Sequence, residues 1–154
     1  MSDKKIVVLY VDDEENNLIS FKATFRIKYK VLTAISGDEA MKILSEQKVD
    51  VIVTDQRMPG MTGVEFLEKV LEQYPDPMRI LLTGYADMNA VIDAVNKGKI
   101  FHYLSKPWNE EELDMTIVRA YETFLEKEKI KLMNENLSLT NEQLEFLLRQ
   151  KLLS

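Results

Sequence analysis

The sequence has no cysteine, which excludes a disulfide framework, a cysteine-ligated metal and a thiol nucleophile. Its only histidine, His102, lies in a strand-like run, so the chain is a poor candidate for a histidine kinase or a phosphotransfer module. No apolar run approaches the ~20 residues of a membrane helix, and the N-terminus lacks the layout of a signal peptide. We therefore expect a cytoplasmic protein. A formal net charge of −6 argues against direct binding to nucleic acid, because phosphate contacts need basic patches.

Short apolar, β-branched runs alternate with segments of helical spacing five times. The runs cover residues 5–11, 29–35, 49–54, 78–83 and 100–104. Such alternation is typical of a parallel sheet with helices on both faces. With the first strand near the middle, we predict an α/β fold with a doubly wound, five-stranded parallel sheet of order 2-1-3-4-5 and a C-terminal helical extension.

Carboxylates follow two of these runs directly. Asp12 and Asp13 follow the first strand, and Asp55 ends the third. The predicted strand order places all three in the crevice between strands 1 and 3, where ligands of such sheets bind. Because the three repel one another, we expect a divalent cation, and all-oxygen ligation favours Mg²⁺ or Mn²⁺. The adjoining Glu14 and Glu15 also fit the charged start of a helix.

Two further residues fit chemistry at this crevice. Lys106 follows the fifth strand and can bring a positive charge to the same rim, and Thr83 ends the fourth strand with a hydroxyl. Taken alone, each is more simply interpreted as an ordinary residue, Lys106 as a surface lysine and Thr83 as a strand end. Together with Mg²⁺ and a carboxylate nucleophile, they indicate phosphoryl transfer to form an aspartyl-phosphate on Asp55.

The full set resembles the receiver domain of a two-component response regulator, a flavodoxin-like fold. The resemblance rests on the acid pair after strand 1 and on Asp55 with Met58-Pro59-Gly60 behind it. Thr83 after strand 4 and Lys106-Pro107 after strand 5 complete it. It covers roughly residues 4–126.

The resemblance implies that Asp55 accepts a phosphoryl group from a phosphohistidine on a sensor histidine kinase or phosphotransfer protein. It further implies that Asp13, Asp55 and the backbone carbonyl of Arg57 hold Mg²⁺, while Asp12 supports the metal mostly through water. Catalysis is then limited to acquiring and slowly losing the chain's own phosphoryl group, so the protein is not an enzyme in the ordinary sense. Arg57 and Tyr85 are expected to shield the phosphoryl group from water.

The resemblance also implies a conformational switch. Lys106 pairs with the phosphoryl oxygens, Thr83 turns inward to hydrogen-bond them, and Tyr103 follows inward. This movement reshapes the face formed by the fourth helix, fifth strand and fifth helix, which is a candidate homodimer surface. The Lys106–Pro107 peptide bond is expected to be cis. Tyr103 also has a plain interpretation as a packing residue of its strand.

Three other functions compete. A phosphatase of the haloacid dehalogenase type needs a second acid two residues after its nucleophile, where this chain has Arg57. A flavin-binding domain needs a phosphate-cradling loop after strand 1, where residues 12–15 are all acidic. A phosphorylation-independent interaction module of the same fold is the remaining alternative, and the complete set of site residues argues against it.

The helical pattern continues beyond the predicted receiver domain, residues 1–126. In residues 127–154, heptad a and d positions fall on an apolar stripe that Thr140 interrupts: Ile130, Met133, Leu137, Leu144 and Leu147. This stripe is typical of a short coiled coil, which would link the receiver to an output domain and could form a homodimer. A solvated amphipathic linker is the alternative, and Thr140 to Gln143 could cap a new helix.

Overall fold

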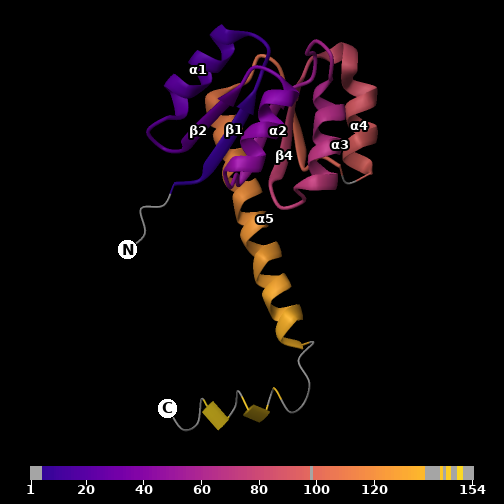
Figure 1. Ribbon diagram of the computed structural model, residues 1–154. Helices are drawn as coiled ribbons and strands as arrows, with labels where there is room; N and C mark the ends of the chain where they lie inside the picture. Colours follow the sequence, from indigo (N-terminus) through magenta and orange to yellow (C-terminus); the bar gives the residue numbers. More distant parts are fainter. Residues whose placement is uncertain (1–4, 98, 138–142, 144, 147–148, 151–154) are drawn as a thin grey trace. The chain divides into compact units, whose positions relative to one another are not determined.

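The computed structural model describes residues 5–97, 99–137, 143, 145–146 and 149–150, without the side chains of Tyr85, Asn136 and Leu137. Five parallel strands form one sheet of order β2-β1-β3-β4-β5, with helices on both faces (Figure 1). The strands are β1 (Val7–Val11), β2 (Lys30–Ala34), β3 (Val51–Asp55), β4 (Met78–Thr83) and β5 (His102–Ser105). The predicted fold and strand order are therefore confirmed.

The helices follow the strands one by one. They are α1 (Glu15–Phe25), α2 (Gly37–Glu46), α3 (Gly63–Gln73), α4 (Met88–Asn96) and α5 (Glu110–Leu137), and a 3-10 turn, η1 (Tyr85–Asp87), precedes α4. Glu15 lies in the first turn of α1, in agreement with its interpretation as part of a charged helix start. Asp12 and Asp13 precede the helix.

The apolar core lies in two layers, one on each face of the sheet. Phe21 and Phe25 of α1 pack with Leu113 and Ile117 of α5 on one face. The other face is covered by α2, α3 and α4, whose buried residues include Ala40, Phe66 and Val91. The central strand is β3, with β1 and β4 beside it. Because β3 and β4 are buried along their whole length, their carboxyl ends are fixed in position.

Side chains cap three of the helices at their N-termini. The Ser36 hydroxyl accepts a hydrogen bond from the Glu39 amide, and Thr62 and Glu65 form the predicted capping box. The Asn109 side chain accepts from the Glu112 amide at 3.0 Å and so caps α5. Each cap satisfies backbone amides that the first helical turn leaves without partners.

The chain divides into two compact units, residues 1–124 and 125–154. In the second unit, residues 125–137 are helical, and the side chains of Ile130 and Met133 are exposed. Thr140, Leu144 and Leu147 lie outside the described residues, so the coiled coil stays a prediction. Among the described residues, no helix is both long and apolar enough to span a membrane.

Candidate functional site

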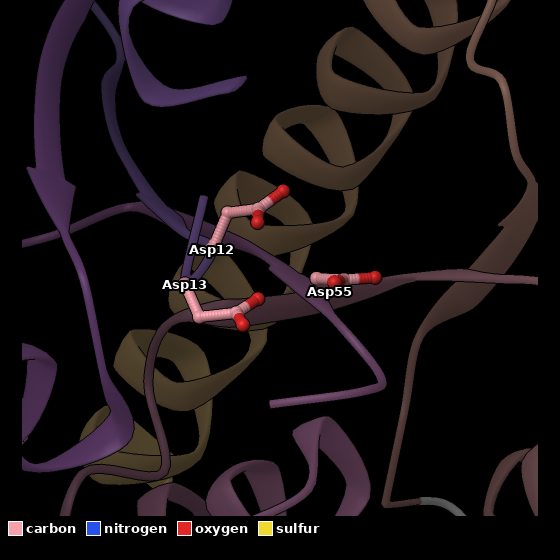
Figure 2. A group of neighbouring side chains, drawn as sticks. All are labelled: Asp12, Asp13 and Asp55. Carbon is pink, nitrogen blue, oxygen red and sulfur yellow. The ribbon is translucent and has the colours of Figure 1, made fainter. Parts of the chain in front are cut away.

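Three carboxylates meet at the carboxyl ends of β1 and β3. These strands are neighbours, with Val11 paired to Thr54, so the residues that follow them lie side by side. Each of Asp12, Asp13 and Asp55 offers an oxygen within 4.8 Å of the others (Figure 2). Figure 2 shows the Asp13 side chain directed toward Asp55. Asp12 and Asp55 are buried, and Asp13 is half-buried, so the group is only partly open to solvent.

Asp12 is held by three hydrogen bonds. One carboxylate oxygen accepts from the Tyr10 hydroxyl at 2.8 Å and from the Asn17 side-chain amide at 3.1 Å, and the other accepts from the Glu14 backbone amide at 3.0 Å. These donors occupy much of the acceptor capacity of this carboxylate. Asp12 is therefore fixed in orientation, which suits a supporting position beside a metal.

Asp55 carries the strongest electrostatic signature of the group. Its carboxylate accepts from the Gln56 backbone amide at 2.9 Å, and the Lys106 ammonium lies 2.5 Å from the same oxygen. Burial raises the pKa of Asp55, the charge of Asp12 adds to the increase, and Lys106 opposes it without cancelling it. Among the described residues, Lys106 is the one cation that pairs with this group of three carboxylates, so the charge balance favours an added cation with oxygen ligands.

The loops that carry Lys106 and Thr83 meet at the ends of β4 and β5. The Lys106 backbone amide donates to the Thr83 carbonyl at 2.9 Å, and the Lys106–Pro107 peptide bond is cis, as expected. Thr83 is fully buried, and its hydroxyl donates to the Gly84 carbonyl at 3.1 Å. Lys106 therefore contacts Asp55 directly, whereas the Thr83 hydroxyl makes a local hydrogen bond.

Close packing holds the loop after Asp55. A Cβ atom at Gly63 would overlap the Asp55 carbonyl oxygen and come within 2.6 Å of Leu81, so only glycine fits at this first residue of α3. The Gln56 side chain accepts from the Val64 amide at 2.9 Å and ties the loop to the start of α3. These contacts fix the backbone on which Asp55 sits.

A cavity of about 260 Å³ opens beside Asp55, and its lining includes Lys106, Arg57 and Asp87. The Arg57 side chain is exposed and pairs with Asp87, with Nε 2.9 Å from a carboxylate oxygen. The side chain of Tyr85, the second expected shielding residue, lies outside what the structure describes. Tyr103 packs against the core layer formed with α2, α3 and α4.

The structure adds residues that the sequence pattern did not single out. Tyr10 reads as an ordinary apolar strand residue and Asn17 as a surface position of a helix, yet both bind Asp12. Spacing gave one usable signal, because position 17 lies about one helical turn after Asp13 and Glu14 of the acid run. Nothing in the sequence marked Gln56 or the pairing of Arg57 with Asp87.

Comparison with known proteins identifies close relatives. Residues 8–119 match the response regulator receiver domain family. The chain is 45% identical over 122 residues to the hydrogenase transcriptional regulatory protein HoxA of Cupriavidus necator, covering 79% of this chain and 25% of HoxA. It is 34% identical over 93 residues to the DNA-binding transcriptional regulator NtrC of Proteus hauseri, covering 60% of this chain and 20% of NtrC. The chain therefore spans about a quarter or less of these relatives.

A solved structure agrees with these relatives. The signal receiver domain of an HD domain-containing protein from Pseudomonas fluorescens Pf-5 superposes with a TM-score of 0.77 at 30% identity, covering 84% of this chain and 96% of that one. The receiver-like part of the chain thus matches nearly the whole of an independently solved domain.

Proposed function

Because this chain belongs to the response regulator receiver domain family of two-component systems, we propose that Asp55 accepts a phosphoryl group from a partner histidine kinase in a Mg²⁺-dependent reaction. The observation that carries the proposal is the contact of Lys106 with the Asp55 carboxylate, inside a cluster of three acids. This arrangement supplies a nucleophile, a cation and a set of metal ligands at one place. We propose that the reaction takes place in the cytoplasm.

The three carboxylates fit a hard divalent cation, because all donors are oxygen atoms and they lie within 4.8 Å of one another. We assign Asp13, Asp55 and the backbone carbonyl of Arg57 as direct ligands. Asp12, whose oxygens already accept three hydrogen bonds, would act through water. When bound, the metal would neutralise charge on the phosphoryl oxygens.

The transfer itself needs positioning more than acid–base chemistry. An ionised oxygen of Asp55 forms a bond to phosphorus while the bond from phosphorus to the imidazole nitrogen of the donor breaks. The leaving imidazole keeps that electron pair and takes a proton from solvent. Lys106, already 2.5 Å from Asp55, would then pair with the phosphoryl oxygens. Catalysis is thereby confined to acquiring and losing this one group.

We assign the switch to Thr83 and Tyr103. Thr83 is buried at the end of β4 and now donates to its neighbouring carbonyl, so its hydroxyl can exchange that partner for a phosphoryl oxygen. Tyr103 is only half-buried on the edge strand β5, which leaves it space to move. The resulting change on α4, β5 and α5 would be read by a partner or by an output domain.

We further propose that residues 1–126 form the receiver domain and that residues 127–154 link it to an output domain. The names of the relatives, a transcriptional regulatory protein and a DNA-binding transcriptional regulator, make nucleic acid binding by such an output domain the leading option. Our expectation of no nucleic acid binding is thus confined to this chain. A homodimer through residues 127–154 should disappear when the chain is cut at Glu126, as measured by sedimentation.

The direct test of the proposed function is intact mass after incubation with Mg²⁺ and acetyl phosphate. Wild type should gain one phosphoryl group, and Asp55→Asn should gain none. Asp93→Asn, which removes an exposed carboxylate of α4, is the matched control and should behave as wild type. A folded wild-type chain that gains no mass would favour the phosphorylation-independent module instead.

A further inference from the structure

The rim of the Asp55 cavity is formed by an ion pair between two loops. Arg57 follows β3 and Asp87 immediately precedes α4, and Arg57 Nε lies 2.9 Å from an Asp87 carboxylate oxygen. Both residues line the cavity of about 260 Å³ together with Asp55 and Lys106. A group attached to Asp55 would therefore enter a space that the Arg57 side chain already borders.

The Asp87 carboxylate has a second candidate partner, the N-terminus of α4. It is the N-cap residue of α4, and aspartate is among the preferred residues there because its carboxylate can accept from the first amides of the helix. Ser36, Thr62 and Asn109 make this bond in their helices. Asp87 makes no side-chain cap hydrogen bond, and its carboxylate faces Arg57 instead. The Asp87 backbone also differs from those caps, with φ −107° and ψ 9° where Ser36 and Thr62 are extended, so a cap from Asp87 requires both release from Arg57 and a turn of its backbone.

The pair is of a kind that a stronger anion can replace. The Arg57 side chain is 73% exposed and that of Asp87 is 24% exposed, so solvent screens their attraction. A phosphoryl group carries nearly two negative charges and three strong acceptor oxygens. Guanidinium groups bind such oxygens in a two-pronged geometry that a single carboxylate contact through Nε does not use. Arg57 would therefore favour the phosphoryl group over Asp87.

We propose that Arg57 is a phosphoryl-binding residue that exchanges Asp87 for the phosphoryl group, and that the released Asp87 then turns to an extended backbone conformation and caps α4. The inference rests on the proposed phosphorylation of Asp55 and adds a route by which it reaches a helix. The freed carboxylate would accept from the amides of Asn89 and Ala90, the second and third residues of α4. Phosphorylation would thereby order the first turn of α4 without any contact between that turn and the phosphoryl group.

Hydrogen exchange of the Asn89 and Ala90 amides tests this exchange in the full chain, with and without Mg²⁺ and excess acetyl phosphate. In wild type, phosphorylation should slow exchange about fivefold, the effect of one added cap. Asp87→Asn can cap but cannot pair with Arg57, and Arg57→Ala frees Asp87. Both variants should therefore exchange slowly before phosphorylation and change little after it. Asp87→Ala can neither pair nor cap, so its exchange should stay fast in both states.

Asp93→Asn removes a carboxylate from another ion pair of the same helix, at 3.0 Å from Lys97, and should respond as wild type. The proposal is overturned if phosphorylation slows exchange in Asp87→Ala as much as in wild type, or if Asp87→Asn and Arg57→Ala exchange as fast as wild type before it. Intact mass, recorded on each sample, separates the two hypotheses. A wild-type chain without mass gain would refute the proposed function and the binding of a phosphoryl group by Arg57. The unphosphorylated variants would still decide whether Arg57 keeps Asp87 from capping α4.

Discussion

Asp114 and Asp55 each form an ion pair with a lysine, yet their surroundings shift their pKa values in opposite directions. Asp114 lies 2.7 Å from the Lys28 ammonium and also accepts from the Tyr29 hydroxyl. Burial acts to raise the pKa of Asp114, but these two hydrogen bonds lower it below its ordinary value. At Asp55 burial prevails over Lys106, and its pKa is raised. One acid is fully compensated by the fold, and the other is not.

The two tyrosine–aspartate bonds make the same contrast. Tyr29 binds an acid that already has its own lysine, so this bond serves the fold. Tyr10 binds Asp12, which belongs to a group of three acids with one lysine nearby. The fold thus neutralises Asp114 with its own groups, whereas the proposed function assigns the site carboxylates to an added cation and a phosphoryl group. Four predictions test this contrast.

Removing the site lysine should have the largest effect. Lys106→Met deletes the only cation that contacts Asp55 in the described part of the chain, so the rate of phosphoryl gain from acetyl phosphate should fall about a hundredfold. Lys99→Met, which breaks a pair with Glu68 elsewhere, is the control and should keep the wild-type rate. The rate is measured by time-resolved intact mass. A loss of less than about threefold would mean that Lys106 does not stabilise the transferring group.

Removing the tyrosine hydroxyls should affect metal binding at one site only. Tyr10→Phe keeps the ring that stacks on Phe21 but removes one of the three hydrogen bonds that orient Asp12, and Mg²⁺ affinity should fall about tenfold. Tyr29→Phe removes the equivalent bond to Asp114 and should leave the affinity unchanged. Trp108, the only tryptophan, lines a cavity with Tyr10 and Asp12, so its fluorescence can report the titration. Equal Mg²⁺ affinities in the two variants would contradict the predicted difference between the hydrogen bonds to Asp12 and to Asp114.

Stability should change in opposite directions at the two acids. In metal-free buffer at pH 7, Asp55→Asn removes a poorly compensated buried charge and should raise the free energy of unfolding by about 1 kcal/mol. Asp114→Asn removes a compensated one and should lower it by about 1 kcal/mol, allowing for solvent screening. Urea unfolding followed by Trp108 fluorescence measures both. A loss of stability in Asp55→Asn would contradict the account.

The smallest effect is the pH dependence of these differences. The pKa of Asp114 is lower in the folded state, so its stabilisation is complete above the unfolded value of about 3.9 and is lost as pH falls through the folded value. The gap between wild type and Asp114→Asn should therefore close in acid. The pKa of Asp55 is higher in the folded state, so its cost begins as pH rises above the unfolded value of about 3.9 and is complete above the folded value. Thermal unfolding at a series of pH values, without metal, checks both trends.

Local sequence pattern was sufficient to predict the sheet order and to locate the acids, because parallel strands place their carboxyl ends at one edge. The predicted strand ends differ by only one or two residues; β5, for example, begins at His102 rather than Ile100. The partners of Asp12 could not be predicted this way, since a tyrosine in an apolar strand looks like packing. The Arg57–Asp87 pair depends on the conformations of two loops, which periodicity does not encode.

The most direct test of the central claim is the position of the phosphoryl group. An aspartyl-phosphate is an acyl phosphate, which borohydride reduces to homoserine, so reduction after phosphorylation marks the acceptor residue permanently. Peptide mapping by tandem mass spectrometry should then find homoserine at position 55 and unchanged aspartate at positions 12 and 13. Homoserine at position 12 or 13, or a phosphorylated chain with no homoserine, would contradict the assignment of Asp55 as the acceptor.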